Sequence, residues 1–301
     1  MLVAMFQDVT AVPQIRLGKM STSPTEDTRF GEGPSWHTED FDIPAYLAAT
    51  GAEHLGGAPA TVDALTELHK AHVHTFPFAN VDILLGTRHG VAPRDVQDRL
   101  VRRHRGGYCF DHAQIFAAAA EHLGFEVTRH LGRVHSEHNS RTHMTVMARI
   151  DGERWLCDPG FGFSLSTPIL VADGAESSGA GRTFTLSEAG EGASRRWSLW
   201  RDGELQHVTD ELPVWPVDVV EGDLFASTHP SAPFPNHLMC MRHTDAGHVT
   251  LTETTRTDRP SGGMTSHAEI GPDDVLAGLE ELGISLDNSE SSQLREWLQA
   301  R

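Results

Sequence analysis

Cys109 is the residue of this chain best placed for covalent chemistry. It ends the segment Arg-Gly-Gly-Tyr-Cys over residues 105–109 and opens a run of apolar residues at helical spacing, which Gly124 ends. The first turn of a helix presents unpaired backbone N–H groups and the positive end of the helix dipole, which favour a thiolate over a thiol. The two glycines leave room for a substrate carbonyl to approach the sulfur. We therefore predict a nucleophile, the alternative being a small buried apolar residue, the usual role of a free cysteine.

A histidine and an aspartate that could serve this nucleophile come from one predicted hairpin. Residues 142–150 and 153–158 alternate in polarity around an Asp-Gly pair, which is typical of a two-residue type I′ turn. The register of that hairpin makes His143 and Asp158 a diagonal pair on one face, within reach of a hydrogen bond. It places Cys157 on the opposite face, in the core, so we predict that Cys157 is structural.

Cys109, His143 and Asp158 together form the set that acyl transfer through a thioester requires. The histidine can take the proton of the thiol, and the aspartate can fix the tautomer of the imidazole. A cysteine hydrolase of the transglutaminase or papain kind uses the same residue order and is one alternative. A metal-binding module built on His135, His138 and His143 is another, although no cysteine pair accompanies these histidines.

Composition narrows the class of protein. A net charge of −18 leaves no basic excess to neutralise phosphates, which argues against a nucleic-acid partner. Three cysteines do not make a disulfide framework and fit a reducing compartment. The first residues lack the basic region of a signal peptide, and no segment has the apolar length of a membrane span. We expect a cytoplasmic protein without a membrane partner.

Changes in periodicity divide the chain into four predicted parts. Residues 1–38 are rich in small, polar and acidic residues and are predicted to be a flexible N-terminal extension. Residues 39–126 carry helical patterns and contain the nucleophile. Residues 127–220 alternate with a period of two, which indicates an antiparallel barrel or sandwich that carries the histidine and the aspartate. Residues 221–301 combine a proline-rich turn, strands and two closing helices.

Two local segments are predicted to lie at the surface without a specific role. Residues 173–182 are rich in Gly, Ser and Ala, which is typical of a loop. A basic cluster precedes the nucleophile, and we interpret it as a solvated helix face rather than a phosphate-binding patch: Arg94, Arg99, Arg102, Arg103 and Arg105.

Three separate motifs resemble those of the arylamine N-acetyltransferase family. They are Arg-Gly-Gly-Tyr-Cys at residues 105–109, Thr-His-Met at residues 142–144 and Asp-Pro-Gly-Phe-Gly at residues 158–162. Residues 76–80 are similar to an early segment of the same family, and residues 227–234 to a turn of its third domain. The order of the motifs along the chain is that of the family.

The resemblance implies an α+β fold with an N-terminal helical bundle, a central antiparallel β-barrel and a C-terminal α/β lid, with a Cys-His-Asp arrangement like that of cysteine proteinases. It implies that Cys109 takes an acetyl group from acetyl-coenzyme A and passes it to the nitrogen of an aromatic amine or hydrazine, in a ping-pong reaction that needs no metal. His143 would be the base and Asp158 the residue that orients it. The alternatives are an amide synthase that releases a polyketide as a macrolactam, which shares the fold and triad, and an acyltransferase with a longer acyl donor. The oligomeric state, including a homodimer, is left open.

The resemblance also implies binding residues. Phe78, Phe161 and Tyr108 would bind the acceptor, whereas Thr145 and the backbone of Gly160 and Gly162 would lie near the acyl donor. The chain departs from the family pattern at four positions close to these motifs: Ala79, Asp111, Ala113 and Pro159.

Overall fold

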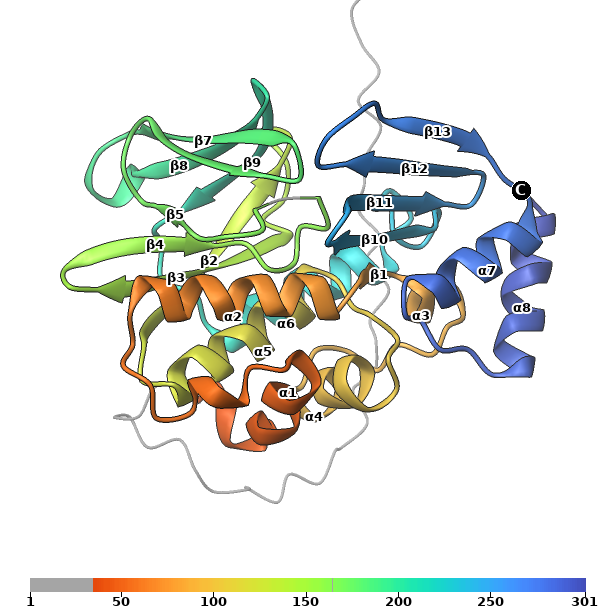
Figure 1. Ribbon diagram of the computed structural model, residues 1–301, viewed down its shortest axis with the longest axis horizontal. Helices are drawn as coiled ribbons and strands as arrows, with labels where there is room; N and C mark the ends of the chain where they lie inside the picture. Colours follow the sequence, from red (N-terminus) through yellow and green to blue (C-terminus); the bar gives the residue numbers. More distant parts are fainter. Residues whose placement is uncertain (1–34, 164) are drawn as a thin grey trace, which may run out of the picture. The chain divides into compact units, whose positions relative to one another are not determined.

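The computed structural model describes residues 35–163 and 165–301. The predicted flexible extension over residues 1–38 lies outside this part of the chain, apart from its last four residues. Within the described part, helices pack against two antiparallel sheets (Figure 1). The predicted α+β fold class is confirmed.

In the described residues, five α-helices precede the larger sheet, and the last of them contacts both three of the other helices and strands of that sheet. The side chains of Asp42 and Thr61 accept hydrogen bonds from backbone N–H groups at the first turns of α1 and α2, as their types predict. Helix α5 is buried along nearly its whole length, and its run of alanines lets it pack closely on strands β2 (Glu126–Val134) and β3 (His143–Ile150) (Figure 1). The helices are α1 (Ile43–Thr50), α2 (Val62–Thr75), α3 (Val81–Leu84), α4 (Pro93–Gln97) and α5 (Cys109–His122).

The larger sheet has eight strands in the order β5-β4-β3-β2-β9-β8-β7-β6 and is nearly closed, because its two end strands approach each other. Its interior is an apolar cluster that includes Leu156, Phe184 and Trp197. The strands are β2 (Glu126–Val134), β3 (His143–Ile150), β4 (Glu153–Cys157), β5 (Ile169–Leu170), β6 (Ala175–Gly179), β7 (Arg182–Ala189), β8 (Arg196–Arg201) and β9 (Glu204–Asp210).

The hairpin of β3 and β4 has the predicted register, with Ile150 opposite Glu153 and Val146 opposite Cys157.

The prediction of a surface loop over residues 173–182 is wrong. Half of that segment, Ala175–Gly179, is strand β6, which pairs with β7. A strand at the edge of a sheet buries few of its side chains. Strand β6 therefore pairs through small polar residues and lacks the alternation of apolar residues that predicts a strand.

The smaller sheet has five strands in the order β1-β10-β11-β12-β13, and its first strand comes from the helical part of the chain. The sequence analysis missed helix α6, because much of its apolar surface is exposed and blurs the helical period. The strands are β1 (Phe78–Ala79), β10 (Met239–Thr244), β11 (Gly247–Thr252), β12 (Thr255–Pro260) and β13 (Ser266–Glu269), and the helices are α6 (Pro216–Thr228), α7 (Pro272–Glu281) and α8 (Asn288–Gln299). No helix in residues 35–163 and 165–301 has both the length and the apolar character to cross a membrane.

The basic cluster before the nucleophile is not a solvated helix face throughout. Arg99 and Arg105 are buried and ion-paired, so neither surface interpretation of these two residues is right. Arg99 binds the Asp111 carboxylate, and Arg105 bonds to Asp82 at 2.9 Å and to Glu290 of α8 at 2.7 Å. The pair between Arg105 and Glu290 joins the turn before α5 to helix α8.

Asp111, which departs from the family pattern, is the acceptor at the centre of these contacts. Its carboxylate accepts the backbone N–H of Tyr108 at 3.0 Å, which caps α5, and it pairs with the guanidinium groups of Arg88 and Arg99. Burial by itself raises the pKa of Asp111, but the two arginines hold it below its usual range. The first turn of α5 is therefore fixed by a buried, charged carboxylate.

We predict that Asp111→Asn destabilises the fold by about 3–5 kcal/mol, because the change leaves Arg88 and Arg99 buried without their shared carboxylate. Urea unfolding measures this difference. The matched control is Asp40→Asn, which breaks the exposed pair with Arg94 and should cost less than about 1 kcal/mol. Equal losses in the two variants would contradict the structural role of Asp111.

Candidate active site

Cys109 is the first residue of α5, and the chain reaches it through a turn held by β1. The N–H of Ala79 donates to the carbonyl of Gly107 at 2.6 Å. Gly106 has φ +67°, and a Cβ atom there would lie 2.7 Å from the carbonyl oxygen of Pro77. Only glycine suits both the backbone angle and the close contact. The glycines before Cys109 therefore let β1 pack against this turn.

His143 and Asp158 form the predicted pair. His143 is the first residue of β3 and Asp158 directly follows β4, and the Nε2 and Oδ1 atoms lie 2.9 Å apart. Both side chains are almost fully buried. The Sγ of Cys109 donates to the carbonyl of Thr142, the residue before His143, at 3.4 Å. Cys109 and His143 line the same cavity, so the structure brings the three predicted residues together.

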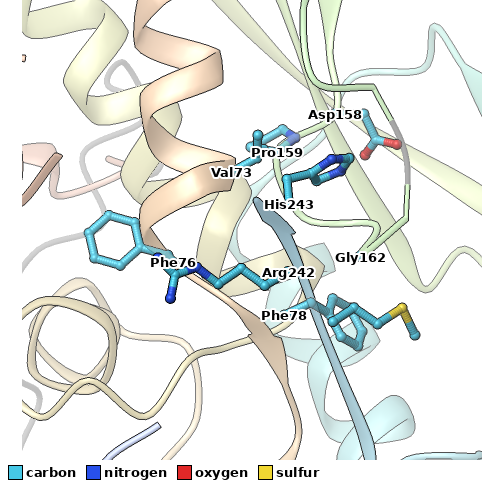
Figure 2. A pocket seen from close by; sticks show the side chains of 9 residues that line it. Val73, Phe76, Phe78, Asp158, Pro159, Gly162, Arg242 and His243 are labelled. Atoms are coloured by element: carbon cyan, nitrogen blue, oxygen red, sulfur yellow. The ribbon is translucent and has the colours of Figure 1, made fainter. Parts of the chain in front are cut away.

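The segment that follows Asp158 crosses over the first turn of α5. A Cβ atom at residue 160 would lie 2.7 Å from the Cα of Cys109 and 2.9 Å from the Cβ of His112, so only glycine permits the crossing. Figure 2 shows the other side of this segment, where Asp158, Pro159 and Gly162 border a small void of about 10 Å³ beside α2 and β10. The loop therefore lies between the nucleophile helix and the smaller sheet.

The environment of Cys109 does not by itself favour a thiolate. Burial raises the pKa of the Cys109 thiol, and the negative charges of Asp111 and Asp158 raise it further. The backbone N–H groups of Met144 and Phe110 oppose this effect without cancelling it. This direction is opposite to the one expected from the helix N-terminus alone. The imidazole of His143 lies on the same cavity, where it can accept the proton of the thiol.

Two histidines that the sequence analysis missed hold Asp158 in place. The Nε2 of His207 on β9 lies 3.3 Å from the second carboxylate oxygen, and the backbone N–H of Asp158 donates to the Nε2 of His69 on α2 at 3.2 Å. Burial by itself raises the pKa of Asp158, but His143 and His207 hold it well below its usual range. Burial lowers the pKa of His69 to about 4, so its ring is a neutral acceptor. Among nineteen histidines, no local signal marks these two.

A metal-binding module built on His135, His138 and His143 is not formed. Within the described residues, the group of His, Cys, Asp and Glu side chains close enough to share an ion is His143, Asp158 and His207, whose ligand atoms lie within 4.8 Å of one another. His138 is exposed, and the Nδ1 of His135 faces a backbone carbonyl at 3.2 Å.

The cavity at Cys109 has a volume of about 820 Å³. Phe78, Phe161 and Gly160 line it, and the Phe161 ring packs edge-on against the His143 ring with centroids 5.0 Å apart. The other three predicted binding residues are elsewhere. Tyr108 is fully buried and its hydroxyl bonds to Asp223, Thr145 is fully buried within β3, and Gly162 borders the small void instead: these residues have no surface on the cavity.

Asn80 joins two of the motifs that the sequence analysis singled out. Its Nδ2 donates to the carbonyls of Phe234 and His237 at 2.8 and 2.7 Å, and its Oδ1 accepts the N–H of Met239 at 2.8 Å. These bonds fix the turn over residues 227–234 beside β1. Phe234, carried by that turn, then forms part of the cavity wall.

Comparison with known proteins agrees with this geometry. The family model for N-acetyltransferase matches residues 61–291. The arylamine N-acetyltransferase of Escherichia coli strain K12 is 30% identical over 247 residues, which are 78% of this chain and 86% of that protein. The chain belongs to the arylamine N-acetyltransferase family.

Solved structures of the family have the same fold. The Mycobacterium abscessus arylamine N-acetyltransferase is 28% identical, with a TM-score of 0.80 over 88% of this chain and 98% of that one. The Mycobacterium marinum enzyme, solved in complex with CoA, is 25% identical, with a TM-score of 0.74 over 86% of this chain and 97% of that one. Membership of the family makes this chain an acyltransferase.

The buried histidines make stability depend on pH. Burial lowers the pKa of seven of them, so the folded chain keeps these rings neutral where the unfolded chain binds protons, below about pH 6.5. They are His69, His72, His112, His130, His207, His243 and His248.

We predict that the free energy of unfolding falls as the pH is lowered from 7.5 to 5, because the unfolded state then binds more protons than the folded state. Each histidine contributes a slope of up to about 1.4 kcal/mol per pH unit. Urea titrations at several pH values measure the free energy of unfolding. In His69→Gln, the slope of this free energy against pH should be smaller by the contribution of a single histidine. A stability that rises as the pH falls over this range would refute the assignment of neutral rings.

Proposed function

We propose that this chain transfers an acetyl group from acetyl-coenzyme A to the nitrogen of an aromatic amine or hydrazine through a thioester on Cys109. The observation that carries the proposal is that Cys109 and His143 line one cavity while Asp158 bonds to His143. The names of the relatives support the acceptor class, and the CoA complex of the Mycobacterium marinum enzyme supports the donor. The three buried free cysteines fit a cytoplasmic enzyme.

The first half-reaction loads the cysteine. His143 takes the proton from the Cys109 sulfur, which then attacks the acetyl carbonyl and forms a new carbon–sulfur bond. The bond to the sulfur of coenzyme A breaks, and that sulfur leaves with the proton held by His143. Backbone N–H groups in the first turn of α5 are candidate donors to the oxyanion. Asp158 keeps the Nε2 of His143 occupied, so the Nδ1 is the nitrogen that exchanges protons.

The second half-reaction passes the acetyl group to the amine. An aromatic amine is uncharged at neutral pH, and its nitrogen attacks the thioester carbonyl while His143 accepts the proton that the nitrogen loses. The sulfur of Cys109 leaves and regains a proton. Phe78 and Phe161, which line the cavity, would hold the aromatic ring of the acceptor.

The remaining predicted residues divide by their position. The backbone of Gly160 lines the cavity, and we retain it as a contact for the acyl donor. Tyr108, Thr145 and Gly162 have no surface on the cavity, so we propose that they support the site through packing. The ring of Tyr108 packs against the guanidinium group of Arg88 beside the start of α5, with the guanidinium carbon 4.3 Å from the ring centroid.

Intact mass spectrometry after mixing the enzyme with acetyl-coenzyme A, with no amine present, tests the proposal. We predict a single acetyl adduct that an aromatic amine discharges, and no adduct in Cys109→Ala. Initial rates should give parallel double-reciprocal lines, because the two substrates react in separate steps.

Two outcomes would contradict the proposal. An adduct that persists in Cys109→Ala would exclude this residue as the nucleophile. No adduct with acetyl-coenzyme A, together with an adduct from a longer acyl thioester, would replace acetyl transfer with a reaction on longer acyl groups, of which an amide synthase is one.

A further inference from the structure

Two arginines line the cavity from different sheets and share one aromatic ring. Arg201 ends β8 of the larger sheet, and Arg259 lies on β12 of the smaller sheet. Their guanidinium carbons lie 4.5 Å and 5.0 Å from the centroid of the Phe163 ring, which also lines the cavity. Two positive charges are therefore held together on one wall of the cavity that contains Cys109.

Neither arginine pairs with a carboxylate within the described part of the chain. Arg201 donates through Nη1 to the carbonyl of Phe163 at 2.7 Å, and Arg259 donates through Nη1 to the hydroxyl of Thr250 at 2.7 Å. Both acceptors are neutral, and each bond uses one nitrogen of its guanidinium group. The other N–H groups can serve an anion in the cavity.

The acidic residues that directly flank the two arginines along the chain are already paired with other cations. Asp202, which follows Arg201, binds Arg182 at 3.0 Å, and Asp258, which precedes Arg259, binds Arg256 at 3.0 Å. In a chain with a net charge of −18, two arginines without a carboxylate partner on one cavity wall are not explained by packing alone.

Charge and burial both act against placing these two cations side by side. Burial lowers the pKa of the Arg201 guanidinium, and the positive charge of Arg259 lowers it further, while the negative charges of Glu204 and Asp202 oppose this shift without cancelling it. Burial also lowers the pKa of Arg259, with Arg182 adding to the effect. The neighbouring ring of His248, whose pKa burial lowers, stacks on Phe163 with centroids 4.0 Å apart and adds no negative charge. A bound anion would relieve the repulsion between the two guanidinium groups.

We propose that Arg201 and Arg259 clamp the phosphate groups of the acyl donor. This inference rests on the proposed function, in which the donor is acetyl-coenzyme A. Coenzyme A carries its phosphates at the far end of the pantetheine arm from the thioester, and the same cavity reaches both Cys109 and the arginines. Two guanidinium groups match a diphosphate better than the single charge of a carboxylate on an acceptor amine.

Steady-state kinetics with two donors test the clamp. The donors are acetyl-coenzyme A and the acetyl thioester of N-acetylcysteamine, which has no phosphate. We expect Arg201→Gln and Arg259→Gln each to raise the KM for acetyl-coenzyme A about tenfold, and the double variant about 100-fold, with kcat nearly constant. The KM for the phosphate-free donor should be the same in the wild-type enzyme and in the variants. The difference in KM between the two donors should therefore disappear in the double variant. Arg295→Gln, which removes an exposed cation paired with Asp273 outside the cavity lining, is the matched control and should leave both KM values unchanged.

Two kinetic outcomes would overturn the clamp. One is an unchanged KM for acetyl-coenzyme A in the double variant. The other is a rise in KM confined to acceptors that carry a carboxylate, such as p-aminobenzoate compared with aniline, which would assign the arginines to the acceptor.

Calorimetric titration with coenzyme A itself separates this proposal from the proposed function. Weaker binding of coenzyme A to the double variant than to the wild-type enzyme and to Arg295→Gln supports the clamp even if no acetyl adduct forms on Cys109. Equal binding in all three, with normal acetylation of Cys109, overturns the clamp and leaves the proposed function standing.

Discussion

Gly160 lies so close to the nucleophile helix that a Cβ atom at this position would stand 2.7 Å from the Cα of Cys109. This contact joins a loop at the end of a β-hairpin to the first turn of α5, and the candidate active site depends on it. The hairpin holds His143 and Asp158 in a fixed register, and the crossing sets that pair beside the sulfur. The buried carboxylate of Asp111 and its two arginines hold the helix side of the contact.

Burial shifts the pKa values of the residues at the candidate site in opposite directions, and these shifts determine which groups are charged. It raises the pKa of the Cys109 thiol, which would leave the sulfur protonated, and it lowers the pKa of His69, which keeps that ring a neutral acceptor for the backbone of Asp158. Asp158 stays charged because two imidazoles face its carboxylate. A charged aspartate next to His143 stabilises the imidazolium that forms when the cysteine loses its proton. In the mechanism we propose, the site therefore gains its reactivity from proton transfer within the triad rather than from the helix dipole alone.

The sequence predicted those parts of the structure that local patterns determine. The Asp-Gly turn at residues 151–152 is sufficient to set the register of β3 and β4, and hence the pairing of His143 with Asp158. Helix α6 escaped prediction because its exposed apolar side chains obscure the helical period, and strand β6 because an edge strand of small polar residues shows no apolar alternation. The contacts of His69 and His207 with Asp158 span 89 and about 50 residues, so no local spacing identifies them.

The rate of alkylation of Cys109 by iodoacetamide as a function of pH, in the wild-type enzyme and in His143→Gln, is the most direct test of this account. Cys157 and Cys240 are fully buried, and Cys109→Ala corrects for their reaction. We predict that at pH 7 the wild-type enzyme reacts at least about 100-fold faster than His143→Gln, and that the difference narrows as the pH rises, because hydroxide then replaces the missing base. Equal rates at pH 7 would contradict the account, since Cys109 would then lose its proton without His143.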